Sequence, residues 1–236
     1  MHLGILNDSI VIRTRGIFYV EPPMIAKSQS TNTQRCKGRP RAFDRDISLR
    51  RAMEIFWQKG YEPTSVSELC AAMGINPPSL YSVFGNKASL FIEAIHFYER
   101  TYWDAPGRAF LAEPDITCAV SKYFETAAHI LLSKETPCGC MIVLAAINIS
   151  EKETKVIQAI QQLRMATKKM FADRLSTAVK DGQIPPDTDI QALAGTLNTF
   201  LEGLSIQARD GLEPSELTSI ASFAVRLLPL LPGETP

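Results

Sequence analysis

The sequence predicts an all-α protein, with a short N-terminal helical domain and a larger C-terminal helical domain. Apolar residues recur at helical spacing in every long segment after about residue 43, and no segment shows sustained alternation of apolar and polar residues. Glycine and proline separate these segments, as at Ala105-Pro106-Gly107 and Pro185-Pro186. Successive amphipathic helices joined by short loops indicate a helical bundle.

The composition is that of an ordinary globular protein. The 236 residues are 45% hydrophobic and 21% charged, and 25 basic residues balance 25 acidic ones. No apolar run approaches the roughly twenty residues that cross a bilayer, and Asp8, Arg13 and Arg15 interrupt the region where a secretory signal is apolar. Five scattered cysteines, an odd number, indicate reduced thiols. We therefore expect a cytoplasmic protein.

Residues 1–42 lack a sustained apolar period. They contain the pair Pro22-Pro23 and the polar stretch 28–33, which are typical of chain that cannot bury enough apolar surface to fold. We expect a flexible N-terminal arm over these residues. From Arg35 to Lys59 the chain has eight basic and three acidic residues, a net charge of +5, so this part of the molecule is locally positive.

Residues 43–88 predict three short helices. We expect them from Asp44 or Asp46 to Lys59-Gly60, from Thr64 to Gly74 and from Ser79 to Phe84. Aspartate and threonine accept hydrogen bonds from the first backbone N–H groups of a helix, and glycine commonly ends one. Proline is well tolerated only in a first turn, so Pro77 and Pro78 mark the start of the third helix.

Residues 89–236 predict the larger second domain. We expect helices over residues 87–102, 116–131, 141–149, 152–181 and 189–210, and a last helix from 214 to 228. Breaks separate them at Ala105-Pro106-Gly107, in the loop 133–138 and at Gly182 with Pro185-Pro186.

The stretch from Thr64 to Lys87 has the pattern of a helix-turn-helix. A buried helix is followed by a turn at Gly74 and by a short second helix that Leu80 and Phe84 anchor. The residues of this second helix that project outward are Ser79, Tyr81 and Ser82. Small and polar side chains on a helix of this kind suit a DNA major groove about 12 Å wide. The pattern therefore favours a DNA-binding domain over residues 43–88.

Many spaced positions agree at once with one protein family. These positions are Gly38-Arg39-Pro40-Arg41, Ala52, Phe56, Gly60-Tyr61, Thr64-Ser65-Val66, Gly74, Ser79-Leu80-Tyr81, Phe84, Lys87 and Leu90. Over residues 38–100 the sequence resembles the N-terminal domain of TetR/AcrR transcriptional regulators. One position departs from the pattern of many relatives. Directly before Ser79, where they carry glycine or alanine, this sequence has Pro78. This proline rigidifies the start of the helix.

The resemblance implies a transcriptional regulator that binds palindromic operator DNA as a homodimer. Because members of this family are commonly repressors, it also implies repression. The implied DNA-binding residues are Arg39 and Arg41 in the minor groove, Thr64 and Ser65 on the backbone, Ser79, Tyr81 and Ser82 on the recognition helix, and Lys87 at a phosphate. We expect two recognition helices, held about 34 Å apart, to enter successive major grooves.

The resemblance also implies that the second domain, residues 89–236, dimerises and holds a small effector. Small residues among leucines in the last two helices, such as Ala192, Gly195 and Gly203, allow close helix approach and predict the dimer interface there. The candidate effector-pocket residues are Trp103, Phe110, Tyr123, Phe124, His129, Met141, Leu144, Met165 and Phe171. Such a lining suits an apolar or aromatic small molecule.

Two alternatives remain open at the level of sequence. Cys138 and Cys140 could form a thiol or metal sensor, since soft thiolates bind copper(I) or zinc, and the helices could serve protein association without DNA. An enzyme is not expected, because the three histidines lack metal-ligand spacing and there is no phosphate-binding glycine loop or nucleophile elbow. We therefore expect no cofactor and no bound metal.

Overall fold

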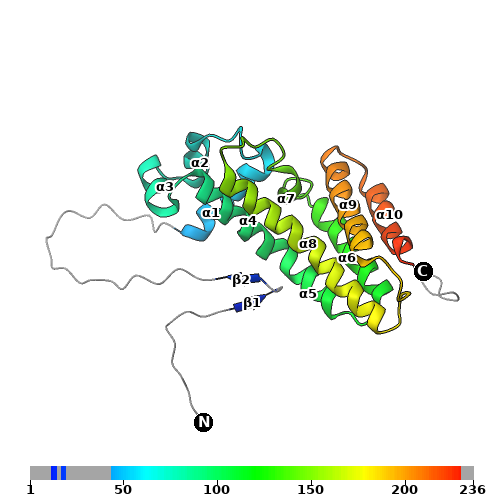
Figure 1. Cartoon of the computed structure of the whole chain (residues 1–236). Helices are drawn as coiled ribbons and strands as arrows, with labels where there is room; N and C mark the ends of the chain where they lie inside the picture. Colours follow the sequence, from blue (N-terminus) through cyan, green and yellow to red (C-terminus); the bar gives the residue numbers. More distant parts are fainter. Residues whose placement is uncertain (1–11, 15–16, 20–43, 230–236) are drawn as a thin grey trace, which may run out of the picture. The chain divides into compact units, whose positions relative to one another are not determined.

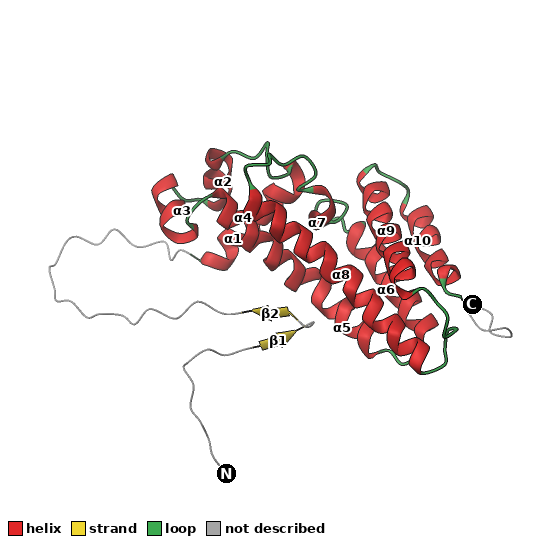
Figure 2. Cartoon of the chain, viewed as in Figure 1, coloured by secondary structure: helices red, strands yellow, loops and turns green. Residues whose placement is uncertain are grey.

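A computed structural model describes residues 12–14, 17–19 and 44–229. The chain divides into two compact units, residues 1–43 and 44–236. In the first unit, β1 (Ile12–Thr14) and β2 (Ile17–Tyr19) pair antiparallel, with Ile12 opposite Tyr19. The sequence predicts a flexible arm over residues 1–42 and no strand within it, because a three-residue strand is too short to show a period of two. The second unit is entirely helical in its described part (Figures 1 and 2).

The helix-turn-helix region contains α1 (Arg45–Lys59), α2 (Val66–Met73) and α3 (Pro77–Phe84). Asp44 caps α1, because its carboxylate accepts hydrogen bonds from the N–H groups of Asp46 and Ile47. The prediction that Thr64 starts α2 is wrong by one residue, since the capping side chain belongs to Ser65. Helix α3 begins at Pro77, so both prolines lie in its first turn as expected.

The remaining helices form the larger part of the second unit. They are α4 (Lys87–Tyr98), the π-helix η1 (Glu99–Trp103), α5 (Asp104–Ala112), α6 (Ile116–Leu131), α7 (Met141–Leu144), α8 (Thr154–Lys180), α9 (Ile190–Arg209), α10 (Pro214–Ser222) and the 3-10 helix η2 (Phe223–Leu227). Figure 1 shows α8 running the length of this domain, with α9 and α10 side by side beyond it. The described part holds no helix that is both long and apolar enough to span a membrane.

Two predicted boundaries in this domain are wrong. The expected break at Ala105-Pro106-Gly107 falls inside the first turns of α5, a place where proline is tolerated, and the chain runs from α4 to α5 through η1. The helix predicted over 141–149 ends at Leu144. Its end has a physical cause, because Arg164 Nη2 donates to the carbonyl oxygens of Ile142 and Val143, each at 3.0 Å. A longer helix would use those oxygens itself.

One continuous hydrophobic core connects the helix-turn-helix region to the rest of the second unit. Helix α1 packs against α2 and α4, and its Trp57 ring lies 4.7 Å from that of Tyr98 and 5.4 Å from that of Tyr102. Farther along, α5, α6 and α8 pack together through aromatic rings. The helix-turn-helix region (α1–α3, the reading head) is therefore packed directly against the C-terminal helices.

Candidate nucleic-acid interface

The turn between α2 and α3 depends on a glycine. Gly74 has φ 69° and ψ 33°, the left-handed conformation that glycine adopts with little strain. Its N–H donates toward the carbonyl oxygens of Cys70 and Ala71, and the N–H of Ile75 donates to that of Cys70 at 3.1 Å. These bonds end α2 abruptly and turn the chain into α3. This confirms the turn that the sequence predicted.

Helix α3 buries one face and leaves the other bare. Leu80 is fully buried and Phe84 is 3% exposed, as predicted, so they fasten the helix to the core. Tyr81 is 51% exposed and Ser82 is also exposed. Ser79 is half-buried in the first turn, where its backbone N–H donates to the side chain of Asn76 at 2.9 Å. The outward face of α3 thus presents a large amphipathic ring beside a small hydroxyl.

Thr64 and Ser65 lie at the start of α2 but have different surroundings. Thr64 is 1% exposed, and its hydroxyl donates to the carbonyl oxygen of Gly60 at 2.6 Å. Its side chain therefore holds the turn before α2 and does not point to the surface. Ser65 is exposed, and its hydroxyl accepts from the N–H of Glu68 while the Glu68 carboxylate accepts from the Ser65 N–H. This reciprocal capping box leaves Ser65 at the surface.

Lys87 opens α4 close to the turn that precedes α2. Its Nζ donates to the carbonyl oxygen of Glu62 at 3.2 Å and lies 4.4 Å from the centre of the Tyr61 ring. Partial burial lowers the pKa of Lys87, while the carboxylates of Glu62 and Glu153 act in the opposite direction. The position combines a cation with a helix N-terminus, and both attract phosphate.

The charged residues around the reading head are partly paired. Arg45 forms an ion pair with Glu93 at 2.5 Å, and Lys59 forms one with Glu68 at 2.5 Å. Those two cations of the positive segment are therefore partly neutralised by neighbours. The predicted minor-groove residues Arg39 and Arg41 lie outside the described residues.

The sequence analysis did not single out three side chains that shape this face, those of Asn76, Glu68 and Glu62. Asn76 caps α3 and Glu68 completes the capping box of α2. Both had a sequence signal: Asn76 directly precedes the two prolines, and Ser65 and Glu68 have the three-residue spacing of a capping box. Glu62 had none, since its contacts with Lys87 and Ser150 arise only from the tertiary fold.

The predicted effector residues divide into a buried group and an exposed pair. Aromatic rings from η1, α5, α6 and α8 form a cluster whose neighbouring centroids lie 5.2–6.2 Å apart; its members are Trp103, Phe110, Tyr123, Phe124 and Phe171. Met141 is buried and Leu144 is half-buried, and both lie within α7. His129 is exposed on α6 and Met165 is 70% exposed on α8, so these two do not join the cluster.

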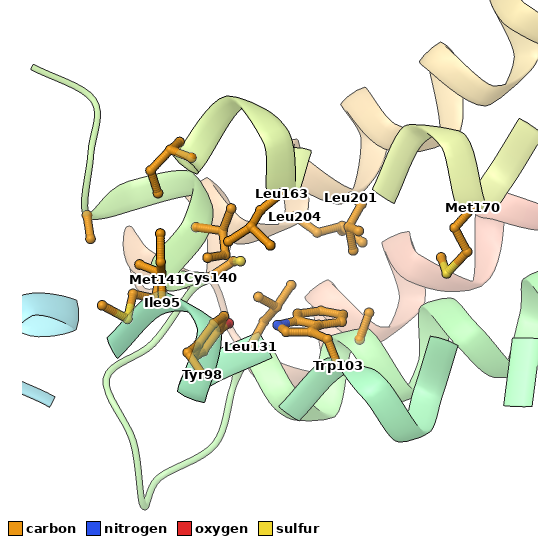
Figure 3. Packing of buried hydrophobic residues seen from close by; sticks show 14 of the residues in the cluster. Ile95, Tyr98, Trp103, Leu131, Cys140, Met141, Leu163, Met170, Leu201 and Leu204 are labelled. Atoms are coloured by element: carbon orange, nitrogen blue, oxygen red, sulfur yellow. The ribbon is translucent and has the colours of Figure 1, made fainter. Parts of the chain in front are cut away.

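Cys140 lies inside the protein beside the aromatic residues of α4 and η1. Figure 3 shows it between Met141 and Leu204, with Tyr98 and Trp103 on the opposite side. Burial raises the pKa of the Cys140 thiol to about 11, so at neutral pH it is a neutral thiol, whereas the thiolate is the metal ligand and nucleophile. Within residues 44–229 and the two strands, no three His, Cys, Asp or Glu side chains gather as metal ligands.

An open and mainly apolar groove of about 850 Å³ runs along α9. It is lined by Ala192, Gly195, Thr196, Thr199, Phe200, Gly203, Leu204 and Gln207 of α9, with Ile220 of α10 and Leu227 of η2. A Cβ atom added to Gly203 would meet nothing within 4 Å. Gly203 therefore leaves open space on this face, whereas a Cβ atom added to Gly195 would lie 3.6 Å from the side chain of Lys168.

Comparisons with known proteins agree with this architecture. A model for bacterial regulatory proteins of the tetR family matches residues 49–94, and a model for tetracyclin repressor-like C-terminal domains matches residues 119–218. The chain is 33% identical to the HTH-type transcriptional repressor ComR of Escherichia coli (strain K12), over 88% of this chain and 99% of that protein. It is 30% identical to the repressor BdcR of the same strain, over 85% of this chain and 95% of that protein.

A solved structure of the same kind extends this similarity. It is the TetR family transcriptional regulator CifR, a cysteine mutant complexed with 26 bp of double-strand operator DNA. The TM-score is 0.77 at 36% sequence identity, and the match covers 81% of this chain and all of that one. The chain therefore belongs to the TetR family of bacterial regulatory proteins, and it is a DNA-binding transcriptional regulator, not an enzyme.

Proposed function

We propose that this regulator represses transcription by binding palindromic operator DNA as a homodimer, until a small molecule releases it. The observation that carries the proposal is the bare face of α3, where Tyr81 and Ser82 are exposed on a helix that Leu80 and Phe84 hold firmly. A rigid, short helix with small polar and amphipathic groups fits a major groove. The repressor names of ComR and BdcR, and the operator in the CifR structure, support the same reading.

A second copy of the chain is the proposed occupant of the groove on α9. In a two-fold dimer each protomer offers the same surface, so small residues on one α9 face those of its partner. Phe200 and Leu204 supply apolar area, while Gly195 and Gly203 permit close approach. The dimer would hold two copies of α3 about 34 Å apart, one in each of two successive major grooves.

The aromatic cluster of α5, α6 and α8 suggests the class of effector. Its rings are buried and pack against one another, as Phe110 and Phe171 do at 5.4 Å, so a ligand that enters between them has to be apolar or aromatic. Effector binding would favour a second arrangement of the helices in which the two copies of α3 no longer match the operator. Reciprocity then requires that operator DNA weaken effector binding by the same factor.

The thiol-sensing alternative receives little support from the geometry. Cys140 is buried with a raised pKa, and neither feature favours a reactive thiolate. Cys138 is half-buried, and the described cysteines are free thiols. The proposal therefore assigns release to a non-covalent ligand.

Titration of DNA from the protein's own gene neighbourhood tests the proposal. We compare the wild type with Tyr81→Ala and Lys87→Ala, and with Lys180→Ala at the far end of α8 as a matched control. Lys87→Ala should weaken binding to all sequences and reduce the salt dependence by about one phosphate contact. Tyr81→Ala should change the relative affinities of different sequences. If both variants bind as the wild type does, α3 is not the reading helix.

A thermal-shift screen of apolar and aromatic compounds tests the effector. A specific ligand raises the melting temperature by mass action, and the same compound should release the protein from its operator. A compound that stabilises the protein but leaves the complex intact would contradict the proposed release.

A further inference from the structure

The C-terminal end of α1 is held by groups from the second domain. Arg209, the last residue of α9, donates from Nη2 to the carbonyl oxygen of Gln58 at 2.5 Å. The indole Nε1 of Trp57 donates to the carbonyl oxygen of Gly139 at 2.9 Å in a buried position. The last carbonyl groups of a helix lack partners within the helix, so Arg209 caps α1 from a residue 151 positions away in the chain.

Both hydrogen bonds connect α1 to α9, the helix that lines the proposed dimer groove. Arg209 makes the first connection directly, and the segment 138–140 makes the second. Arg209 Nη1 also donates to the carbonyl oxygen of Cys138 at 3.4 Å. One turn earlier, the hydroxyl of Ser205 accepts from the N–H of Cys140 at 2.7 Å. Helix α9 therefore holds the segment 138–140, and that segment in turn holds Trp57.

The link between α1 and α9 is polar at this point. A groove of about 630 Å³ lies here, lined by Glu54, Ile55 and Gln58 of α1, the loop residues 134–137 and Arg209. Arg209 is the residue of α9 that borders this groove, so its guanidinium bridges the two helices at the surface, beside the continuous hydrophobic core. Loss of Arg209 should therefore loosen the link without emptying the core.

We propose that Arg209, together with Trp57, is a positioning residue for operator binding. It sets the direction of α1, and with it the direction of α3, relative to the dimer helix α9. The two residues thereby determine which separation of operator half-sites the dimer accepts. This inference rests on the proposed function, and it adds two residues outside α3 to those that control recognition.

The physical consequence is a preference for spacing. One added base pair displaces a half-site by about 3.4 Å and rotates it by about a tenth of a turn. If α1 is held firmly, the altered spacing strains the complex and lowers the affinity. If α1 is held loosely, α3 can shift to meet the displaced half-site, and the affinity falls less. The affinity of a single half-site does not depend on this link, because only one reading head is engaged.

The experiment uses the full-length protein and DNA selected by the wild type from a random library. The selected palindrome is compared with versions one base pair longer and shorter, and with a single half-site. The variants are Arg209→Met and Trp57→Phe, which keeps an aromatic ring beside Tyr98 but loses the Nε1–H donor. Arg108→Met on α5 is the control, because it removes an equally charged, exposed arginine elsewhere. Sedimentation measures the oligomeric state of each protein.

Arg209→Met should reduce the wild type's discrimination between the selected and altered spacings by about tenfold, the scale of one charge-assisted hydrogen bond. Trp57→Phe should act in the same direction. Half-site affinity, the dimer and the behaviour of Arg108→Met should not change. Unchanged spacing discrimination, or an equal loss of affinity for the half-site and the full site, overturns the inference. If the wild type selects no DNA, the proposed function itself fails, and the inference with it.

Discussion

At the scale of single residues, Gly139 occupies a place where no larger side chain fits. Its φ is 82°, and a Cβ atom there would lie 2.4 Å from Leu144 Cδ1 and 2.8 Å from the carbonyl oxygen of Ser205. The second contact is with backbone and cannot move easily. Gly139 also accepts the hydrogen bond from Trp57, so its position joins α9 to the reading head.

We expect Gly139→Ala to lower the free energy of unfolding by about 3 kcal/mol, from backbone strain and overpacking together. Gly182→Ala is the matched control, because its φ is 71° and a Cβ atom would meet nothing within 4 Å. The control should lose only about 1 kcal/mol. Urea denaturation measures both, and equal losses would show that the close approach at Gly139 carries no cost.

Glu68 makes a second residue-scale contribution, and this one depends on pH. Hydrogen bonds from Lys59 and Ser65 lower its pKa from 4.5 to about 2. A carboxyl whose pKa is depressed by folding stabilises the protein above its unfolded pKa, and it loses that contribution as pH falls toward the folded value. The capping box of α2 should therefore weaken in acid.

Glu68→Gln tests this dependence. The wild type should be more stable than the variant at neutral pH, and the difference should shrink as pH falls from about 5 to about 2. Denaturant unfolding at a series of pH values measures it, and added salt should reduce it because the pair with Lys59 is exposed. A difference that stays constant with pH would mean that the carboxylate charge is not the cause.

At the scale of elements, the aromatic cluster joins α5, α6 and α8 into one unit. Phe171 is fully buried on α8, stacks 6.0 Å from Phe124 and meets Phe110 edge-on at 5.4 Å. Met165 lies on the same helix, but it is 70% exposed. Phe171 therefore lies on the face of α8 that packs in the core, and Met165 lies on its outer face.

Phe171→Ala should lower the free energy of unfolding by about 3–5 kcal/mol, because it leaves a cavity among rigid rings. Met165→Ala should change it by about 0.5 kcal/mol or less. Thermal or urea unfolding monitored by circular dichroism measures both. A comparable loss at Met165 would mean that another surface covers that side chain in solution.

Element boundaries show where sequence reasoning succeeds and where it fails. Asp44, Gly74 and the two prolines of α3 act on their own backbone, so their effect follows from the neighbouring sequence. The choice between Thr64 and Ser65 as the cap of α2 did not follow, because both residue types cap helices. The end of α7 was also hidden, since it depends on Arg164, about twenty residues later.

At the scale of the whole molecule, the groove on α9 is the surface through which we propose that two copies of the chain assemble. Thr196 lines this groove and is exposed, and its hydroxyl donates to the carbonyl oxygen one turn earlier. Thr177 on α8 is also exposed and makes the same kind of back-bond. Arginine at either position thus removes the same kind of hydrogen bond within a helix. The two substitutions differ in that only position 196 lies in the groove on α9.

Thr196→Arg should convert the dimer to monomer and abolish operator binding, because a two-fold interface would bury two unpaired guanidinium groups. Thr177→Arg should leave both properties as they are in the wild type. Sedimentation velocity and DNA titration measure them. A Thr196→Arg protein that remains dimeric would place the interface on another surface.

The sequence by itself determined the features that depend on near neighbours: the helical class, the turn at Gly74, the buried Leu80 and Phe84, and the exposed Tyr81. Their physics lies in helical periodicity, capping and backbone freedom, which act over a few residues. The tertiary structure alone decided that Thr64 is buried, that His129 and Met165 face outward, and that Arg209 caps α1. Those outcomes depend on surfaces that distant segments bring together, and a linear pattern carries no record of which surfaces meet.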